Sequence, residues 1–173
     1  MKAYLAVLIA ASMAFGETID EYEVKAAFLY NFTKFVEWTN LPGTDAFNIC
    51  ILGDDPFGDS LDRLVQGKTA SNRRIQIRRI KDAVEGRQCQ IVFVRREEDA
   101  KAAKLIEAVR GLPVLTVSEY YKFTKMGGMI FFSTKEGRVN IGINPQPAEG
   151  AGLKISAKLL NISKIGKDES EGP

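Results

Sequence analysis

The chain has 173 residues, of which 45% are hydrophobic and 27% charged, a balance typical of one globular domain rather than of a disordered or coiled-coil chain. Its formal charge is only +2, from 24 Lys and Arg against 22 Asp and Glu, so it lacks the field that attracts nucleic acid, and no nucleic-acid partner is expected. It contains no histidine. Catalytic sites built on Ser-His-Asp or Cys-His, and zinc or haem sites with His ligands, are therefore excluded.

Residues 1–16 have the three-part pattern of a secretory signal peptide. Lys2 supplies a positive start, the run Ala3–Phe15 is uncharged and mostly apolar, and the small residues of Ala14-Phe15-Gly16 precede the acidic Glu17. The run is too short to span a bilayer of roughly 30 Å. We expect cleavage near Gly16 and export to the periplasm. A buried N-terminal helix is the alternative.

The chain then alternates between helix-like and strand-like patterns. Residues Ile19–Trp38, behind Thr18 or Asp20 as a cap, carry apolar side chains at helical spacing and predict a helix. Its aromatic stripe is expected to pack in the core, with contact to a partner at its outer edge as the alternative. Strands are expected at Phe47–Leu52, Arg74–Ile80, Gln90–Val94 and Pro113–Val117, and helical segments from Gly53-Asp54-Asp55-Pro56 to about Val65, at Lys81–Val84, Glu98–Arg110 and Glu119–Met126, and from Gly152-Leu153 onward.

Near the C-terminus the pattern changes. Met129–Phe132 and Val139–Ile143 flank the turn Thr134–Gly137 and predict a β-hairpin. Four strands that alternate with helices indicate a mainly parallel sheet with helices on both faces, to which the hairpin adds an antiparallel edge. The expected fold class is thus α/β, with three layers, in a single domain over residues 17–166 and a polar tail at 167–173.

The two cysteines lie on the first and third expected strands. Cys50 is within the first, and Cys89 enters the third. In the flavodoxin-like strand order these strands are neighbours, which brings two residues within the distance that a disulfide needs. An oxidising periplasm favours the disulfide. Two buried free thiols that act as small hydrophobes are the alternative.

One loop lies where open α/β sheets bind ligands. Gly53, Asp54, Asp55 and Gly58 follow the carboxyl end of the first strand. Two adjacent aspartates repel phosphate, and the glycine spacing is not that of a nucleotide-binding loop. A capped helix start is the main interpretation, and a small-ligand contact is the alternative. We expect no metal, no cofactor and no catalytic group.

A series of landmarks, in this order and spacing, resembles one protein family. They are Glu23–Phe32 with Phe35–Trp38, Ile49–Gly53, Cys89–Phe93, Leu115–Ser118, Gly127–Ile130 and Ala151–Leu160. Together they resemble the YfiR family of small periplasmic proteins over nearly the whole mature chain.

The resemblance implies regulation by binding and not catalysis. The best-understood members repress an inner-membrane diguanylate cyclase by binding its periplasmic sensor domain, which keeps cyclic-di-GMP and biofilm formation low. Members are dimeric, an outer-membrane lipoprotein can sequester the repressor, and other signalling proteins are possible partners. Cys50 and Cys89 match one disulfide pair of that repressor, whereas a second pair, around Tyr120–Phe132, has no counterpart here.

A repressor acts by binding one conformation of its target better than another, which requires an exposed apolar patch rather than a reactive group. The candidates are Met129, Phe131 and Ile143 on the hairpin, and Leu153 and Leu160 on the last helix. The competing hypothesis is a periplasmic small-molecule-binding module, with a pocket lined by the loop Gly53–Gly58 and the loop after Val94. An enzyme is the least expected of the three.

Overall fold

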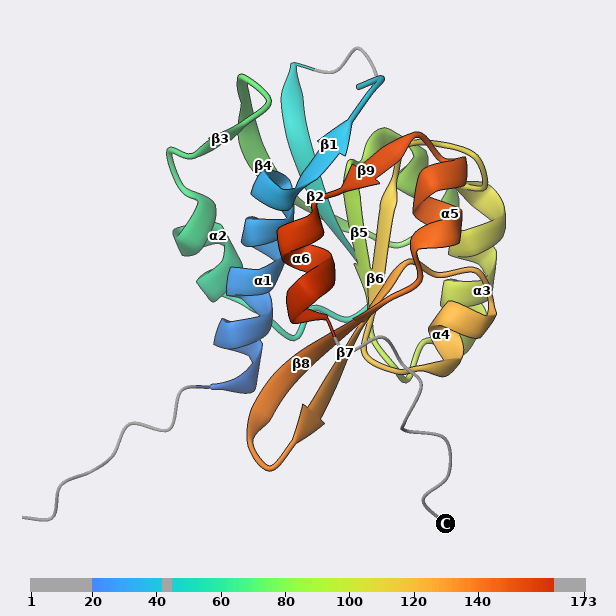
Figure 1. Ribbon diagram of the computed structural model, residues 1–173. Coiled ribbons are helices and arrows are strands. Elements are labelled where there is room, and N and C mark those ends of the chain that lie inside the picture. The colour runs from blue at the N-terminus through green and yellow to red at the C-terminus, as the bar shows by residue number, and fades with distance from the viewer. Residues whose placement is uncertain (1–19, 42–44, 164–173) are drawn as a thin grey trace, which may run out of the picture.

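The computed structural model describes residues 20–41 and 45–163, which form an α/β fold around one large sheet (Figure 1). The expected leader, its cleavage point and the polar tail 167–173 lie outside the described residues. The strands are β1 (Val36–Trp38), β2 (Ala46–Leu52), β3 (Thr69–Ala70), β4 (Arg73–Ile80), β5 (Ile91–Val94), β6 (Leu115–Ser118), β7 (Ile130–Lys135), β8 (Arg138–Ile143) and β9 (Leu153–Ile155). The helices are α1 (Glu21–Phe35), α2 (Asp59–Val65), the 3-10 helix η1 (Ala83–Gln88), α3 (Asp99–Ala108), α4 (Lys122–Lys125), α5 (Pro145–Gly150) and α6 (Ala157–Ile162).

The large sheet has seven strands in the order β3-β4-β2-β5-β6-β7-β8. The five central strands pair in parallel; they are β4, β2, β5, β6 and β7. Strands β3 and β8 add an antiparallel edge at each end. Numbered along the chain, the parallel strands follow the flavodoxin-like order 2-1-3-4-5. The expected fold class, including the antiparallel hairpin of β7 and β8, is confirmed.

Strand β2 divides the core into two layers because its side chains alternate between the two faces of the sheet. Phe47, Ile49 and Ile51 pack in the layer that contains the buried sides of α1, α2 and α6. Cys50 and Leu52 pack in the opposite layer, with η1, α3 and α4. Every residue from Phe47 to Leu52 is buried, which explains why all of them except Asn48 are apolar.

A second, two-stranded sheet corrects two of the sequence predictions. Helix α1 begins as expected, with Asp20 accepting a hydrogen bond from the Tyr22 N–H (3.2 Å), but it ends at Phe35 and not at Trp38. Val36–Trp38 is β1, which pairs antiparallel with Leu153–Ile155 as β9. The last helix therefore begins at Ala157, not at Gly152-Leu153, and the Ser156 side chain caps it by accepting from the Leu159 N–H (3.2 Å).

Other boundaries also differ from the predictions. The segment Lys81–Val84 is not a helical turn of its own, because the 3-10 helix η1 starts at Ala83 behind a capping box of Asp82 and Glu85. Helix α2 begins only at Asp59, and Glu119–Met126 contributes just the short helix α4. Neither α5 nor β3 was expected, since Pro145–Gly150 reads as a loop and Thr69–Ala70 is too short to show a pattern.

The predicted disulfide is confirmed. Cys50 and Cys89 are joined with their Cα atoms 6.1 Å apart, and both are fully buried. The link is possible because β5 lies directly beside β2, where Cys50 is opposite Val92. The bond thus joins the two ends of the segment that contains α2, β3 and β4.

We predict that removing the link with Cys50→Ala and Cys89→Ala lowers the free energy of unfolding by about 4 kcal/mol, since the bond closes a loop of 39 residues in the unfolded chain. Urea unfolding followed by circular dichroism measures the change. Reduced wild-type protein is the control that removes the bond without removing side-chain volume. Equal unfolding midpoints for the oxidised and the reduced wild type would contradict the prediction.

Candidate functional site

The loop Gly53–Gly58, the predicted ligand contact at the carboxyl end of β2, is held by hydrogen bonds from the Arg79 side chain. The Arg79 guanidinium donates to Asp55 (2.8 Å), to the Gly58 carbonyl (3.0 Å) and to both carboxylate oxygens of Asp62 (2.8 and 2.5 Å). Asp55 also accepts from the Phe57 N–H (2.8 Å). The hydrogen bond from Arg79 lowers the pKa of Asp62 although partial burial opposes this, so Asp62 stays ionised. The polar groups of Asp55 and Gly58 are thus engaged by the protein itself.

The helix start after this loop differs from the predicted one. Gly58, and not an aspartate, precedes α2, with no side-chain hydrogen bond to the helix end. Asp54 is exposed. Gly53 has a φ of +83°, and a Cβ there would lie 2.6 Å from Glu98 Oε1. Gly53 is therefore required by its backbone conformation, and the carboxylate of Glu98 would have to move to admit a Cβ there.

A buried ionic cluster lies at the same edge of the sheet. Lys25 of α1 donates to Glu119, which follows β6, across 2.5 Å, and it also pairs with Glu21 one turn earlier in α1. The side chains of Lys25 and Glu119 are only 4% and 7% exposed. Arg96, after β5, adds a hydrogen bond from its guanidinium to the Glu119 carbonyl oxygen (2.9 Å). The cluster thus ties α1 to two loops of the sheet.

The chemistry of this cluster is structural. Burial lowers the pKa of Lys25, but hydrogen bonds to Glu119 and Glu21 outweigh it, so the pKa is raised and the amine stays protonated. A nucleophilic or basic lysine requires the opposite shift. Sequence reasoning missed the cluster, because Glu21 and Lys25 at helical spacing read as an ordinary surface pair.

Within residues 20–41 and 45–163, no group of three or more His, Cys, Asp or Glu side chains is placed to hold a metal ion. In that same part of the chain, no helix has the length and the apolar character needed to cross a bilayer.

The five predicted partner-binding residues do not form one surface. Met129, Phe131, Ile143 and Leu153 are 5%, 9%, 7% and 1% exposed, so the expectation that they lie in an exposed patch is wrong. Leu160 alone is partly exposed. Leu153 is buried because β9 pairs with β1 instead of lying on a surface helix.

The burial of Phe131 has a local cause. Its ring covers Gly142 on the neighbouring strand, where a Cβ would collide with it, and Tyr121 packs edge-on against it with the ring centres 5.6 Å apart. Met129 and Ile143, like Phe131, lie near the base of the hairpin, inside the fold. The tip of the hairpin, at residues 134–138, is exposed instead and is polar.

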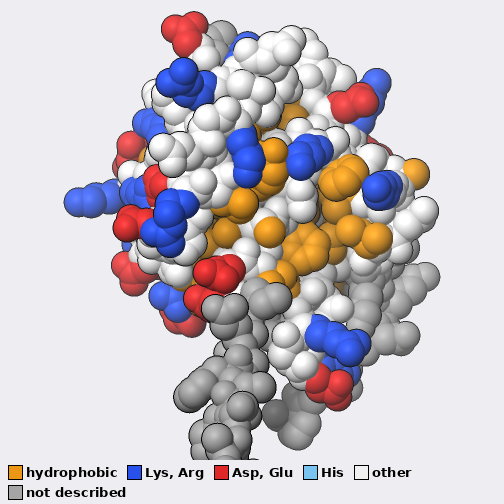
Figure 2. All heavy atoms as spheres, turned by 90° about the vertical axis from the view of Figure 1, so that its left-hand side faces the viewer, with side chains coloured by type: hydrophobic (Ala, Val, Ile, Leu, Met, Phe, Trp, Pro, Cys, Tyr) orange, Lys and Arg blue, Asp and Glu red, His pale blue; other side chains and the backbone are white. Residues whose placement is uncertain are grey.

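Apolar side chains do gather on another face, formed by α1 and α6 (Figure 2). The two elements adjoin, since the Ser156 N–H donates to the Phe35 carbonyl (2.8 Å) and Lys158 Nζ lies 5.3 Å from the centre of the Phe35 ring. Ile162 is 58% exposed, and the others are half-buried against the core. We call this surface the α1–α6 strip; it consists of Phe28, Phe35, Ile155, Leu160 and Ile162.

The sequence contains two signals for this strip. Phe35 belongs to the aromatic stripe of the first helix, whose outer edge was an alternative candidate for partner contact, and Leu160 was among the candidates on the last helix. Ile155 and Ile162 gave no such signal.

The chain matches a known protein family over most of its length. The model of the YfiR/HmsC-like family matches residues 22–164. The chain belongs to the YfiR/HmsC-like family. The match begins in α1 and covers both sheets and α6, so it confirms the resemblance seen in the sequence. Membership in the YfiR/HmsC-like family supports a periplasmic, non-catalytic regulator of cyclic-di-GMP signalling.

We predict that Lys25→Met lowers the free energy of unfolding by about 3–5 kcal/mol, because Glu119 is then buried without its cation. Adding Glu119→Leu to that variant restores most of the loss, since both charges are then absent. Chemical denaturation of the single and double variants measures both effects. Lys34→Met, an exposed lysine of the same helix, is the matched control. A loss for Lys25→Met no greater than for Lys34→Met would show that the pair does not hold α1 in place.

Proposed function

We propose that this protein represses a membrane diguanylate cyclase, or a related sensor, by binding its periplasmic domain through the α1–α6 strip. The observation that supports the proposal is the gathering of one exposed and four half-buried apolar side chains on α1, β9 and α6 of a YfiR/HmsC-like fold. Ile162 is one of two large hydrophobic side chains that are more than half exposed among the described residues. Apolar patches of this kind mark interaction sites.

The charges around the strip favour a partner of defined character. Lys34 of α1 and Lys158 of α6 are exposed on the elements of the strip, whereas Lys154 of β9 lies opposite the exposed Glu37 of β1. An apolar centre with a basic rim is complementary to an apolar surface with an acidic rim. The proposed sensor domain therefore presents carboxylates around an apolar contact.

Repression by this route needs no reactive group. A regulator shifts the sensor toward its inactive conformation by binding that conformation more tightly, and the size of the shift is set by the difference in affinity. The regulator must then keep its own binding surface fixed. The ion pair between Lys25 and Glu119 holds α1 against the sheet, and the pairing of β1 with β9 positions the start of α6.

The α1–α6 strip also bears on the other proposed partners. An outer-membrane lipoprotein that covers the strip competes with the sensor and relieves repression. A homodimer remains part of the proposal, as does delivery to the periplasm by cleavage near Gly16.

We predict that Ile162→Glu weakens binding to the purified sensor domain of a neighbouring-gene cyclase at least about tenfold, because it places a charge within the apolar contact. Titration calorimetry measures the affinity. Val84→Glu is the matched control, since Val84 on η1 is 55% exposed, close to the 58% of Ile162, but lies away from the strip. Size-exclusion chromatography of both variants reports whether the strip also joins two copies.

Two outcomes would reject this function. One is equal weakening by Ile162→Glu and Val84→Glu. The other is the absence of measurable binding between the oxidised wild-type protein and the periplasmic domain of any membrane signalling protein that is encoded beside it.

A further inference from the structure

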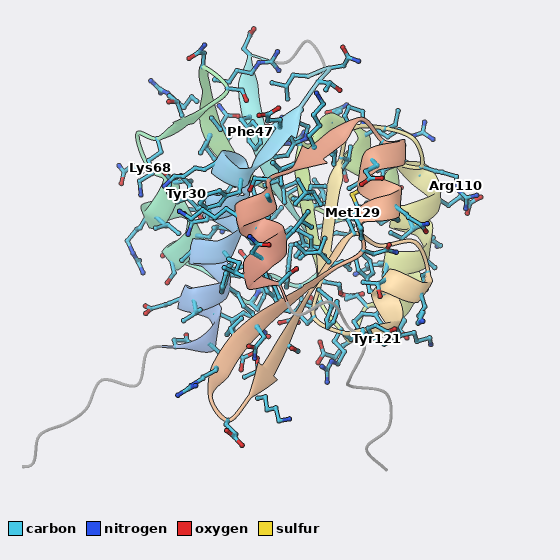
Figure 3. All side chains as sticks on the ribbon, in the orientation of Figure 1. Tyr30, Phe47, Lys68, Arg110, Tyr121 and Met129 are labelled. Atoms are coloured by element: carbon cyan, nitrogen blue, oxygen red, sulfur yellow. A yellow bond between two sulfur atoms is a disulfide. The ribbon has the colours of Figure 1, made fainter. Side chains whose placement is uncertain are left out.

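A hollow of about 530 Å³ lies where the C-terminal ends of three helices meet the sheet. Arg110 and Gly111 follow α3, Lys125 and Met126 end α4, and Gly150 ends α5. In Figure 3, Met129 lies inside the fold beside α5, whereas Arg110 stands at the outer edge, near the end of α3. The volume is within the range of small-molecule sites. The hollow shares no residue with the α1–α6 strip or with the loop Gly53–Gly58.

The inner wall of the hollow is apolar. Ile106 and Val109 come from the end of α3, Met126 from the end of α4, Met129 from the segment before β7, and Pro147 from α5. Val109 and Met129 are buried, while Ile106, Met126 and Pro147 are partly exposed. Two methionines give the wall side chains that adjust to the shape of a ligand.

Two cations stand at the hollow without a carboxylate partner. Within the described residues, no ion pair includes Arg110 or Lys125. Lys125 Nζ lies 5.1 Å from the centre of the Tyr121 ring, a contact that leaves its N–H groups free to donate. Both residues are exposed, so an incoming ligand can reach them.

Arg110 is not needed to satisfy the end of α3. The Arg87 guanidinium already donates to the Ala108 carbonyl (2.9 Å), and the Leu112 N–H donates to the Val109 carbonyl (2.9 Å). The carbonyls of Ala108 and Val109 therefore have partners without the Arg110 side chain, whose positive charge is available to another group.

A buried hydroxyl completes the lining. Thr116 of β6 is 1% exposed, and its Oγ1 accepts a hydrogen bond from the Met129 N–H (3.2 Å). A hydroxyl that accepts one hydrogen bond can still donate its proton. The hollow thus offers an apolar wall, a hydroxyl and two cations.

We infer that this hollow binds a small amphipathic carboxylate. The apolar body lies against Val109, Met126 and Met129, and the carboxylate lies at Arg110 and Lys125, where the charges are complementary. This site is independent of the proposed partner interaction, because its ligand is a small molecule and its residues lie outside the α1–α6 strip.

The test uses the oxidised protein and two probes of matched length, octanoate and octanol. Titration calorimetry, supported by displacement of the fluorescent anion anilinonaphthalene sulfonate, measures their binding. We expect saturable octanoate binding in the millimolar range. The double variant Arg110→Ala and Lys125→Ala weakens octanoate binding by on the order of tenfold and leaves octanol binding unchanged, since only the carboxylate uses the cations.

Matched controls lie on the same two helices. Lys104→Ala on α3 and Lys122→Ala on α4 remove exposed lysines that do not line the hollow, so octanoate binding should not change. Gly150→Leu adds an apolar side chain to a residue that lines the hollow, where a Cβ meets no atom within 4 Å, and it should change the binding of both probes alike. Circular dichroism checks that this variant is folded, and the double variant carries the test if it is not.

The inference is overturned by any of three results. Octanoate shows no saturable binding to the wild type. Its affinity is the same in the double variant as in the two control variants. Octanol binds more tightly than octanoate. None of these results bears on binding of the sensor domain, so the site and the proposed function can fail separately.

Discussion

The burial of β2 on both faces is the constraint on which the fold depends. Its odd-numbered residues Phe47, Ile49 and Ile51 need a cover of helices on one side, and Cys50 and Leu52 need another on the opposite side. Each fully buried side chain of this size contributes roughly 1.5–3 kcal/mol, so neither layer can be removed without exposing a large part of the core. Helices α1, α2 and α6 on one face, and η1, α3 and α4 on the other, are the result.

The regions with different roles lie apart on this scaffold. The layer of α1 and α6 carries the apolar strip, whereas the hollow lies at the ends of α3, α4 and α5 and is lined from both layers, by Met129 of the first and Val109 of the second. Between them, Lys25 and Glu119 join a helix of one layer to the end of a central strand. A buried ion pair adds little net stability, but it specifies one position for α1, because any other position leaves a buried charge without its partner. The strip thereby keeps a fixed shape, which a protein that acts by binding requires.

Local patterns predicted most of the large sheet and missed what distant contacts decide. The apolar run Phe47–Leu52, the alternation in Arg74–Ile80 and the strand–helix order sufficed for the fold class and for the neighbouring positions of Cys50 and Cys89. Val36–Trp38 was read as helix because helical spacing continues through it, yet it pairs with Leu153–Ile155, more than a hundred residues away.

The candidate surfaces were harder to predict for the same reason. Met129, Phe131 and Ile143 have the composition of an exposed contact, and only the packing of Tyr121 and Gly142 around Phe131 reveals that this part of the hairpin belongs to the core. The cluster of Lys25 and Glu119 joins residues 94 positions apart, and its members have no special character in the sequence. The hollow is formed by helix ends. One of these helices is α5, whose two prolines make it hard to recognise as a helix in the sequence.

The covalent bond between Cys50 and Cys89 encloses the turn between β3 and β4, where Ser71 and Asn72 are exposed and both have positive φ values. A protease that cuts the backbone at this turn would leave two fragments still connected through sulfur. In an oxidising compartment the cleaved protein would keep the mass of the intact chain, and its two fragments would separate only after a reductant breaks the disulfide. The edge formed by β3 and β4 therefore tolerates a break in the chain that would separate the two pieces in a protein without the bond.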